Sequence, residues 1–339
     1  MKEKVRVEDI ARVLNISAST VSRALNDHPR ISKETKEKVK QLASRMGYRP
    51  GIPELTNPEK TEAIVVLVPN LENELYRGLL AGLTEYLEKE SFQTFVVNTN
   101  GDEGRVDAFF KSYKKYGISG IVHFICNRNI SSGFYSVPLK DALPLVSVFE
   151  PDKAVDVSSV LPDMFQGISK IVRYLKSVKV SRVALLLEDE MRPEDFQIFS
   201  TFESAFEIEG MNGDDLSVHY LDRAVASFVK NVELILKGKN RPQAILVKGG
   251  YTVVEIVNLC GRLKLKIPED ILLIAITADS NSSALTSNLS MLKLPAYEMG
   301  YKAAQLIMDQ IHDVDAGKKT AIKPASFILK GSAIRMKTN

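Results

Sequence analysis

From residue 63 to residue 313, short apolar runs alternate with amphipathic stretches, and this alternation limits the chain to one fold class. Strand-like runs occur at 63–69, 92–98, 119–125, 144–149, 182–187, 243–247 and 271–276, and helix candidates lie near 73–90, 103–116, 163–177, 195–209, 223–238, 251–264 and 295–313. Such alternation predicts parallel sheets with helices on both faces. Because about 280 residues exceed the usual size of one domain, we expect two doubly wound lobes.

The first 50 residues follow a different, purely helical pattern. Residues 7–14 place apolar side chains at 7, 10, 11 and 14, on one side of a helix. Ser17 can cap a second helix over 18–26, whose Val21 and Leu25 face inward, and a third helix is expected to start at Ser32 and continue to Gly47. This spacing predicts an all-α helix-turn-helix head.

A proline-rich stretch separates the head from the body. The sequence YRPGIPELTNPEKT (48–61) contains prolines at 50, 53 and 58, which remove amide donors and disfavour helix. We therefore predict three parts of the chain: the helical head over residues 1–50, a linker or hinge over 51–61, and the body of two lobes over 62–339.

Charge is concentrated in the head. Residues 1–50 carry twelve Lys or Arg and six Asp or Glu, a balance of +6, whereas the whole chain has a formal net charge of +3. The remaining residues therefore sum to −3. A basic head on a slightly acidic body suggests a polyanion as the partner of the head alone, although a solvated basic face is the ordinary alternative.

The second helix has short, hydrogen-bonding side chains outside its core positions, which would let its backbone lie deep in a DNA major groove. Arg23 can pair with a guanine edge, and Ala18 and Ser19 can reach bases. The remaining candidate DNA-binding residues, suited to capping or to phosphate contact, are Ser17, Thr20, Ser22, Asn26 and Ser32. A three-helix structural bundle is the alternative, and the charge and the linker favour DNA.

The head resembles the LacI family of bacterial transcription regulators, through IARVLNISASTVSRALND and RISKETKEKVKQLASRMGYRP. The body is similar to the periplasmic-binding-protein-like domain of the same family, notably in KIPEDILLIAI (266–276) and LSMLKLPAYEMGYKAAQLI (289–307). The resemblance implies a homodimer that binds a pseudo-palindromic double-stranded DNA operator, with base reading by Ala18, Ser19 and Arg23.

Ligands of doubly wound folds bind at the carboxyl ends of strands. The stretches 68–76 and 98–102 and the loops after residues 149, 187, 247 and 276 are therefore expected to border a cleft. Candidate effector-binding residues are Asn73, Tyr76, Asn100, Asp102, Phe149, Phe165, Lys248 and Thr277. Each residue also has an alternative role without a ligand. Asn100 and Asp102 are common turn residues, and Phe149 and Phe165 can simply fill the cleft. Lys248 can meet an anionic group or be a solvated charge.

The cleft departs from the family pattern. Ile198 stands where the family commonly places a sugar-binding arginine, Gly249-Gly250 where it has Asn-Asp, and Thr277 where it has aspartate. A hydroxyl-rich ligand would leave polar atoms unpaired there, each at a cost of roughly 1–3 kcal/mol. The effector, a sugar or another metabolite, therefore stays open. The linker departs too, since Pro53 and Pro58 interrupt the segment that forms a hinge helix in the family.

The rest of the sequence argues against an enzyme. We find no Walker or GxGxxG pattern after a strand and no nucleophile elbow, and we expect no cofactor. Two distant cysteines and four isolated histidines lack metal-ligand spacing, so reduced thiols and no metal site are expected. With no long apolar run, a cytoplasmic location and no membrane contact are expected.

Together these features predict a DNA-binding transcriptional regulator that acts as a repressor and responds to a small-molecule effector. The alternatives are a regulator without a sugar effector, constitutive or controlled by a protein partner, and a solute-binding module. The module should show a signal peptide and an intact polar pocket, and this sequence shows neither.

Overall fold

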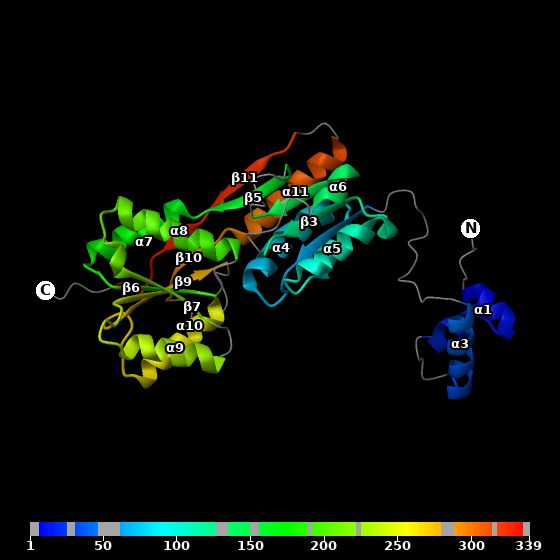
Figure 1. Cartoon of the computed structure of the whole chain (residues 1–339), viewed down its shortest axis with the longest axis horizontal. Coiled ribbons are helices and arrows are strands. Elements are labelled where there is room, and N and C mark those ends of the chain that lie inside the picture. Colours follow the sequence, from blue (N-terminus) through cyan, green and yellow to red (C-terminus); the bar gives the residue numbers. More distant parts are fainter. Residues whose placement is uncertain are drawn as a thin grey trace. The chain divides into compact units, whose positions relative to one another are not determined.

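A computed structural model of the chain describes residues 7–25, 31–46, 62–126, 135–149, 156–188, 192–221, 225–278, 288–313 and 317–334. The chain divides into two compact units, Met1–Glu59 and Lys60–Asn339 (Figure 1). Within the described residues, the first unit holds three helices and the second holds two α/β lobes. The expected linker at 51–61 lies outside the described residues, so the nature of its hinge stays a prediction.

The head consists of α1 (Val7–Leu14), α2 (Ala18–Leu25) and α3 (Lys33–Met46). Its core is formed by small and β-branched side chains from all three helices: Ile10, Ala11, Val21, Ala24, Val39 and Ala43. The predicted caps are confirmed, because the Ser17 hydroxyl accepts the Thr20 amide at 3.1 Å and the Ser32 hydroxyl accepts the Thr35 amide at 3.2 Å. These caps set the start of α2 and α3.

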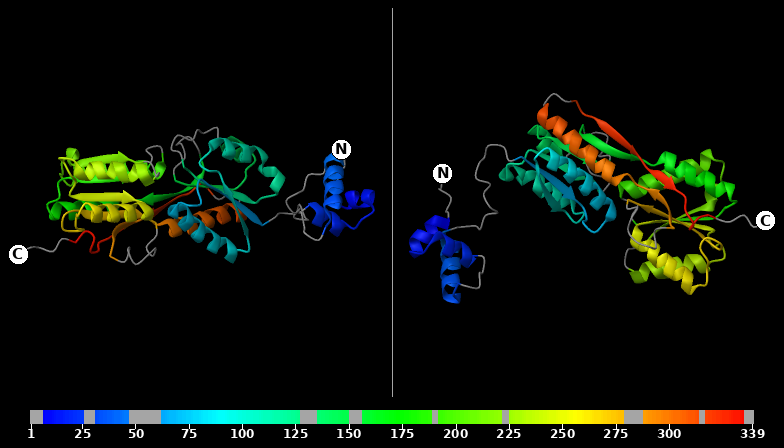
Figure 2. Two further views of the ribbon diagram at one scale, coloured as in Figure 1. Left: turned by 90° about the horizontal axis from the view of Figure 1, so that it is seen from below. Right: turned by 180° about the vertical axis from the view of Figure 1, so that it is seen from behind.

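The N-terminal lobe is built on a parallel sheet in the order β11-β5-β4-β3-β1-β2. Its strands are β1 (Ala63–Val68), β2 (Gln93–Asn98), β3 (Gly120–Phe124), β4 (Leu145–Val148), β5 (Ser158–Asp163) and β11 (Thr320–Pro324). Its helices are α4 (Glu74–Lys89), α5 (Glu103–Ser112), α6 (Ser136–Lys140) and α11 (Ala296–His312), with a 3₁₀ turn η1 (Tyr113–Tyr116). α4 packs along α11 on one side of the sheet, and α5 lies on the other (Figure 2).

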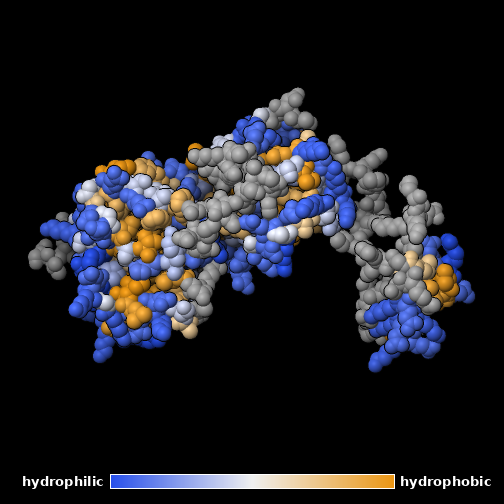
Figure 3. Space-filling model, viewed as in Figure 1, coloured by the Kyte–Doolittle hydropathy of each residue, from blue (hydrophilic) through white to orange (hydrophobic). Residues whose placement is uncertain are grey.

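The C-terminal lobe has a second sheet in the order β12-β10-β9-β8-β6-β7, in which β12 alone is antiparallel to its neighbour. Its strands are β6 (Val183–Leu187), β7 (Leu216–Tyr220), β8 (Ala244–Lys248), β9 (Leu272–Thr277), β10 (Ser290–Lys293) and β12 (Ser326–Ile328). Its helices are α7 (Phe165–Ser177), α8 (Pro193–Ile208), η3 (Gly213–Asp215), α9 (Val225–Lys237) and α10 (Gly250–Arg262). In Figure 3, hydrophobic side chains appear in patches among hydrophilic ones on this lobe.

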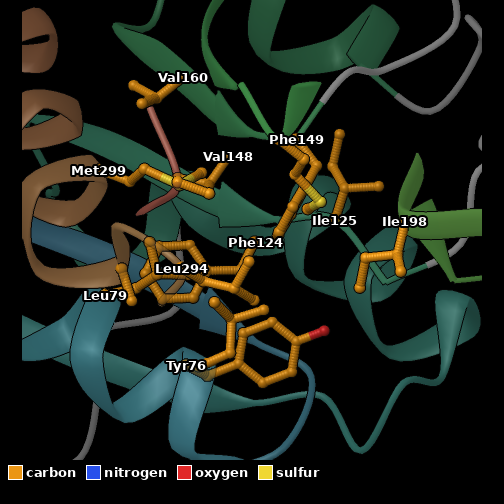
Figure 4. Packing of buried hydrophobic residues seen from close by; sticks show 14 of the residues in the cluster. Tyr76, Leu79, Phe124, Ile125, Val148, Phe149, Val160, Ile198, Leu294 and Met299 are labelled. Atoms are coloured by element: carbon orange, nitrogen blue, oxygen red, sulfur yellow. The ribbon is translucent and has the colours of Figure 1, made fainter. Parts of the chain in front are cut away.

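Both lobes bury their central strands on two faces, which explains the continuous apolar runs in the sequence. In β6, Val183, Leu185 and Leu187 belong to one core cluster, while Ala184 and Leu186 belong to another on the opposite face. Figure 4 shows part of the larger cluster, which joins side chains of both lobes, including Tyr76 of α4 and Ile198 of α8. The predicted class, an α-helical head on an α/β body of two parallel-sheet lobes, is confirmed.

The chain passes between the lobes after β5, after β10 and after β11. Every strand and helix predicted in the body corresponds to an observed element, but β5, β7, β10, β11 and β12 were not predicted. None of the helices within the described ranges has the length and apolar character that crossing a membrane requires.

Candidate functional site

The outer face of α2 is the first candidate site. Val21 and Ala24 of this helix are fully buried against the rest of the head, so the opposite side faces outward, and Arg23 is exposed there. Ser17 is exposed, but its hydroxyl is engaged in the cap and also bonds the Thr20 hydroxyl at 2.8 Å. The helix thus presents a long cationic side chain beside short ones, on a face that no core packing requires.

The structure places the remaining predicted DNA-binding residues as follows. Ala18 and Thr20 are half-buried, and Ser32 is exposed at the start of α3. Ser19 and Ser22 belong to α2, and Asn26 lies outside the described residues. Among the members whose burial the structure describes, Ser17, Arg23 and Ser32 are exposed, and contact of any of the predicted residues with DNA remains a prediction.

The second candidate site is a cavity of about 540 Å³ in the body. Its lining residues lie at or after the carboxyl ends of β1, β2 and β3, except for Arg192, which directly precedes α8. The cavity therefore lies between the lobes, at strand ends, as parallel sheets predict. Its lining is formed by Pro69, Asn70, Leu71, Glu72, Tyr76, Asn98, Asn100, Gly101, Cys126 and Arg192.

Tyr76 of α4 forms part of the cavity wall. Its ring packs parallel to Phe124, with ring centroids 6.2 Å apart, and its side chain is 1% exposed. The Tyr76 hydroxyl lies on the side of its ring away from Leu79 (Figure 4) and has no hydrogen-bond partner among the described residues. Burial, and then the negative charge of Glu194, raise the Tyr76 pKa well above its ordinary value, so the hydroxyl stays neutral at pH 7.

Of the other predicted polar residues, Asn100 lines the cavity, and its backbone has a positive φ of 55° beside Gly101 at 70°. Asn73 caps α4 by accepting the Leu75 amide at 3.0 Å, and Asp102 caps α5 by accepting the Gly104 amide at 2.8 Å. These two are positioned by the helices that they start, so their local role is structural.

Lys248 lies at the end of β8 and is buried. This burial excludes one alternative raised from the sequence, that Lys248 is a solvated charge. It is 5% exposed, and its ammonium donates to Glu194 Oε1 at 3.1 Å and to Asp195 Oδ1. Burial disfavours the charged ammonium, but the two carboxylates outweigh burial and raise the Lys248 pKa. The anionic groups that Lys248 meets here belong to α8 of the protein itself.

Three other predicted effector residues do not line the cavity. Phe149 is 2% exposed and belongs to the core, while Phe165 is 39% exposed and borders a separate hollow of about 380 Å³ with Ile322. Thr277 is buried and donates to Glu74 Oε1 at 2.7 Å, which connects β9 of one lobe to α4 of the other. The threonine hydroxyl thus serves an interlobe contact.

The sequence did not identify Arg192, Glu194 and Asp195 as site residues. Arg192 donates to Glu188 Oε2 at 2.8 Å, and both residues follow β6, in the loop that was expected to border the cleft. The sequence held no signal for the acid pair after Pro193, because acids are common in the first turn of a helix and the burial of these two appears only in the fold. Ile198, which stands at the arginine position of the family pattern, is fully buried in the core.

Cys126 and Cys260 are free thiols, as predicted, although Cys126 is only half-buried and lies on the cavity. Burial raises the pKa of both thiols to about 11, so both are protonated at pH 7. Within the described ranges, His, Cys, Asp and Glu side chains do not gather in threes where they could hold a metal ion.

Two family models each match a part of the chain. Residues 6–51 match the bacterial regulatory proteins of the lacI family, and residues 172–333 match the periplasmic binding protein-like domain. The first match contains the whole described head, and the second contains most of the C-terminal lobe together with α11.

Curated relatives and solved structures agree with these matches. Catabolite control protein A of Staphylococcus aureus is 22% identical over 97% of this chain and 99% of its own length. The HTH-type transcriptional regulator pepR1 of Lactobacillus delbrueckii subsp. lactis is 23% identical over 98% of this chain and 99% of its own length. The structure of the transcriptional regulator CelR in complex with cellobiose has a TM-score of 0.68 at 18% identity and covers 97% of this chain and 100% of its own. A ribose-bound LacI family transcriptional regulator from Enterococcus faecium has a TM-score of 0.70 at 19% identity. The match covers 81% of this chain and 100% of that one.

Proposed function

Because the chain belongs to the LacI family of bacterial transcriptional regulators, we propose that it binds a pseudo-palindromic DNA operator as a cytoplasmic homodimer and represses transcription. It is a DNA-binding regulator with a ligand-binding effector domain. In this proposal a small molecule in the interlobe cavity changes operator affinity. We assign the protein no catalytic role, in keeping with relatives that are themselves regulators.

The observation that carries the proposal is the outer face of α2. Arg23 is exposed on a short helix whose inner face is fully buried, and Ser17 fixes the helix start through its cap. An arginine on such a helix can form a bidentate pair with a guanine edge in the major groove. The remaining basic residues of the head supply attraction to phosphates.

The homodimer is supported by the edges of the two sheets. β2 ends one sheet and β7 ends the other, and exposed edge strands invite pairing or coverage by another chain. Phe95 and Val96 of β2 are 45% and 42% exposed, and Tyr220 of β7 is 38% exposed. A second copy of the chain that covers these edges would remove the apolar side chains from water.

Effector control in this proposal is thermodynamic linkage between the cavity and the head. The cavity takes residues from both lobes, and Thr277 of one lobe bonds Glu74 of the other beside it. A ligand that binds one arrangement of the lobes more tightly than another shifts the population of that arrangement and, through the dimer, operator affinity.

A specific observation favours an effector other than a neutral sugar. Ile198 is buried where the family pattern has a sugar-binding arginine, and Thr277 is engaged with Glu74 where the pattern has an aspartate. The relatives solved with cellobiose and ribose therefore do not define the effector of this chain.

Selection of genomic fragments by the purified full-length protein tests the proposal. We expect enrichment of one sequence with two-fold symmetry, bound with one dimer per site in sedimentation measurements. Enrichment of no sequence over bulk DNA would contradict sequence-specific regulation, and a monomer on a single half-site would contradict the dimer alone.

A further inference from the structure

The body has a second hollow, of about 380 Å³, beside the chain crossings that follow β5 and β11. We call it the hinge hollow, and it lies between Asp163 at the end of β5, Phe165 at the start of α7, Ile322 of β11 and the middle of α8. The two crossings are joined here, because the Ala325 amide donates to the Asp163 carbonyl oxygen at 2.7 Å. Within the described residues, the hinge hollow shares no lining residue with the interlobe cavity. It is therefore a separate space that both lobes border.

Large apolar side chains line the hinge hollow and are open to solvent. Ile322 is 63% exposed, Phe165 is 39% exposed, and Leu161 of β5 is half-buried in the same lining. These side chains come from three different elements, and they differ from a single exposed apolar residue because one ligand can cover all of them. The hinge hollow therefore suits a molecule with a compact apolar body.

The hydroxyl groups of α8 that line the hinge hollow are oriented to accept hydrogen bonds. Thr201 donates its hydroxyl hydrogen to the Gln197 carbonyl oxygen at 2.6 Å, and Ser200 donates to the same oxygen at 3.3 Å. Ser204, which is exposed, donates to the Ser200 carbonyl oxygen at 2.9 Å. Each hydroxyl has only one hydrogen, which its own helix already uses, so its oxygen is left to a ligand as an acceptor. A ligand that supplies donors fits this wall.

Asp163 is the only ionisable residue in the described lining of the hinge hollow. Its Oδ1 accepts the Phe165 amide at 2.9 Å and so caps α7, which leaves its other oxygen for a ligand. α8 supplies no cation, because its charged residues are all acidic. Lys323 follows Ile322 in β11, but successive side chains of a strand point to opposite faces, so Lys323 lies on the other face of the sheet. The charge of the lining is therefore negative.

We propose that the hinge hollow is a second ligand site, which binds a small organic cation with one ammonium group on a compact apolar body. The ammonium pairs with Asp163 and donates to hydroxyl oxygens of α8, while the apolar body covers Phe165 and Ile322. A neutral molecule of the same shape lacks the charge-assisted hydrogen bond, and an anion is repelled by Asp163. This inference goes beyond the proposed function, because the site is separate from the interlobe cavity.

Calorimetric titration of the full-length protein at low ionic strength tests the ligand class. The probes are 2-phenylethylamine, 2-phenylethanol and phenylacetate, which share a phenyl ring on a two-carbon chain and differ in charge, and ethylamine, which lacks the ring. We expect 2-phenylethylamine to bind about tenfold more tightly than each of the other three, or tighter still. No binding of this amine, equal affinities, or a preference for the alcohol or the acid would overturn the inference.

Asp163→Asn locates the ammonium group. Asparagine keeps an oxygen that can cap α7 and removes the charge, so the melting temperature should change little while the affinity for 2-phenylethylamine falls about tenfold. The matched control Asp107→Asn removes an equal charge from α5, where Asp107 pairs with Lys111, and it should leave the affinity unchanged. Unchanged affinity in Asp163→Asn, or equal losses in both variants, would show that the hinge hollow does not hold the amine.

Phe165→Ala tests the apolar contact. Because Phe165 is 39% exposed, its truncation should lower the melting temperature only slightly, whereas the affinity for 2-phenylethylamine should fall about three- to tenfold. Tyr251→Ala removes an aromatic ring that is 60% exposed on α10, and as the matched control it should leave the affinity unchanged. Equal affinities of the two variants would contradict the site. These titrations contain no DNA, so failure to bind the amine overturns this inference and leaves the proposed operator binding untouched.

Discussion

Arg23 is the residue on which base recognition depends in this account. It is exposed on α2, and its neighbours on that face are short enough to let the guanidinium approach a base edge. Arg23→Ala should cost about 1–3 kcal/mol at the specific site and relax the base preference there. Competition binding with single-base operator variants measures this change.

The matched control is Arg12→Ala, which removes an equal charge from the exposed end of α1, where Arg12 pairs with Asp9. It should weaken binding to all duplexes alike, as the loss of one cation does. If Arg23→Ala instead weakened every duplex equally, Arg23 would be a phosphate contact.

Lys248 supports the folded body through charge compensation. Lys248→Met would leave Glu194 and Asp195 buried without their cation, and we expect the free energy of unfolding to fall by about 3–5 kcal/mol. Lys237→Met breaks an exposed pair with Glu233 and should change stability little. Urea unfolding of both variants provides the comparison, and equal small effects would show that the buried pairing is dispensable.

His123 gives the body a pH dependence. It is buried against Tyr135, and burial lowers its pKa from 6.5 to about 3. The unfolded chain then binds a proton that the folded chain does not, so this contribution to stability is complete above pH 6.5 and is lost as pH falls from 6.5 towards 3. At pH 5 the loss is about 2 kcal/mol.

The variant His123→Gln isolates this effect, because glutamine cannot titrate. The difference between the urea-unfolding free energies of wild type and variant should shrink or reverse between pH 7 and pH 5. A difference that is constant over this range would mean that His123 titrates alike in both states.

At the scale of elements, the contact between α4 and α11 depends on glycine. A Cβ added at Gly82 would overlap the carbonyl oxygen of Tyr297, and one at Gly300 would overlap that of Leu79. Gly82→Ala should therefore destabilise the body by about 1–3 kcal/mol, because the backbones must move apart.

Gly261 of α10 is the matched control, since a Cβ there meets no atom within 4 Å. Gly261→Ala should stabilise the protein by about 0.5–1 kcal/mol through helix propensity. Thermal unfolding of the two variants should move in opposite directions, and a shared direction would contradict the packing argument.

The sequence predicted those strands that carry a strong apolar run. β1, β3 and β9 are buried on both faces, so nearly every position is apolar. The edge strands β7 and β11 contain polar residues and are partly exposed, β12 has three residues, and β5 contains Pro162. Their strand conformation depends on pairing with distant segments, which local patterns do not reveal.

The sequence likewise predicted only a part of the candidate site. Tyr76 and Asn100, chosen for their strand-end positions, line the cavity, and their contact with an effector stays a prediction. Lys248 bonds Asp195, which is 53 residues away in the sequence, and Thr277 bonds Glu74, which is 203 residues away. Only the tertiary structure brings these partners together. A lysine beside two glycines therefore appeared accessible in the sequence and is buried in the fold.

At the scale of the whole molecule, the lobes are joined by three chain crossings and by contacts such as Thr277 with Glu74. Thr277→Val removes this hydrogen bond while keeping the side-chain shape. If lobe arrangement is linked to the head, the variant should change operator affinity severalfold without altering base preference. Unchanged affinity in fluorescence anisotropy titrations would show that this contact does not take part in coupling.

The central claim is that the protein positions two copies of the outer face of α2 on base edges. The most direct measurement is the affinity of the full-length protein for duplexes from its own promoter region, titrated against salt in the presence of non-specific competitor DNA. We predict a complex that survives the competitor and whose affinity falls linearly and steeply on a log–log plot against salt, because several phosphates are neutralised. If no duplex from that region forms such a complex at any salt concentration, the account is contradicted.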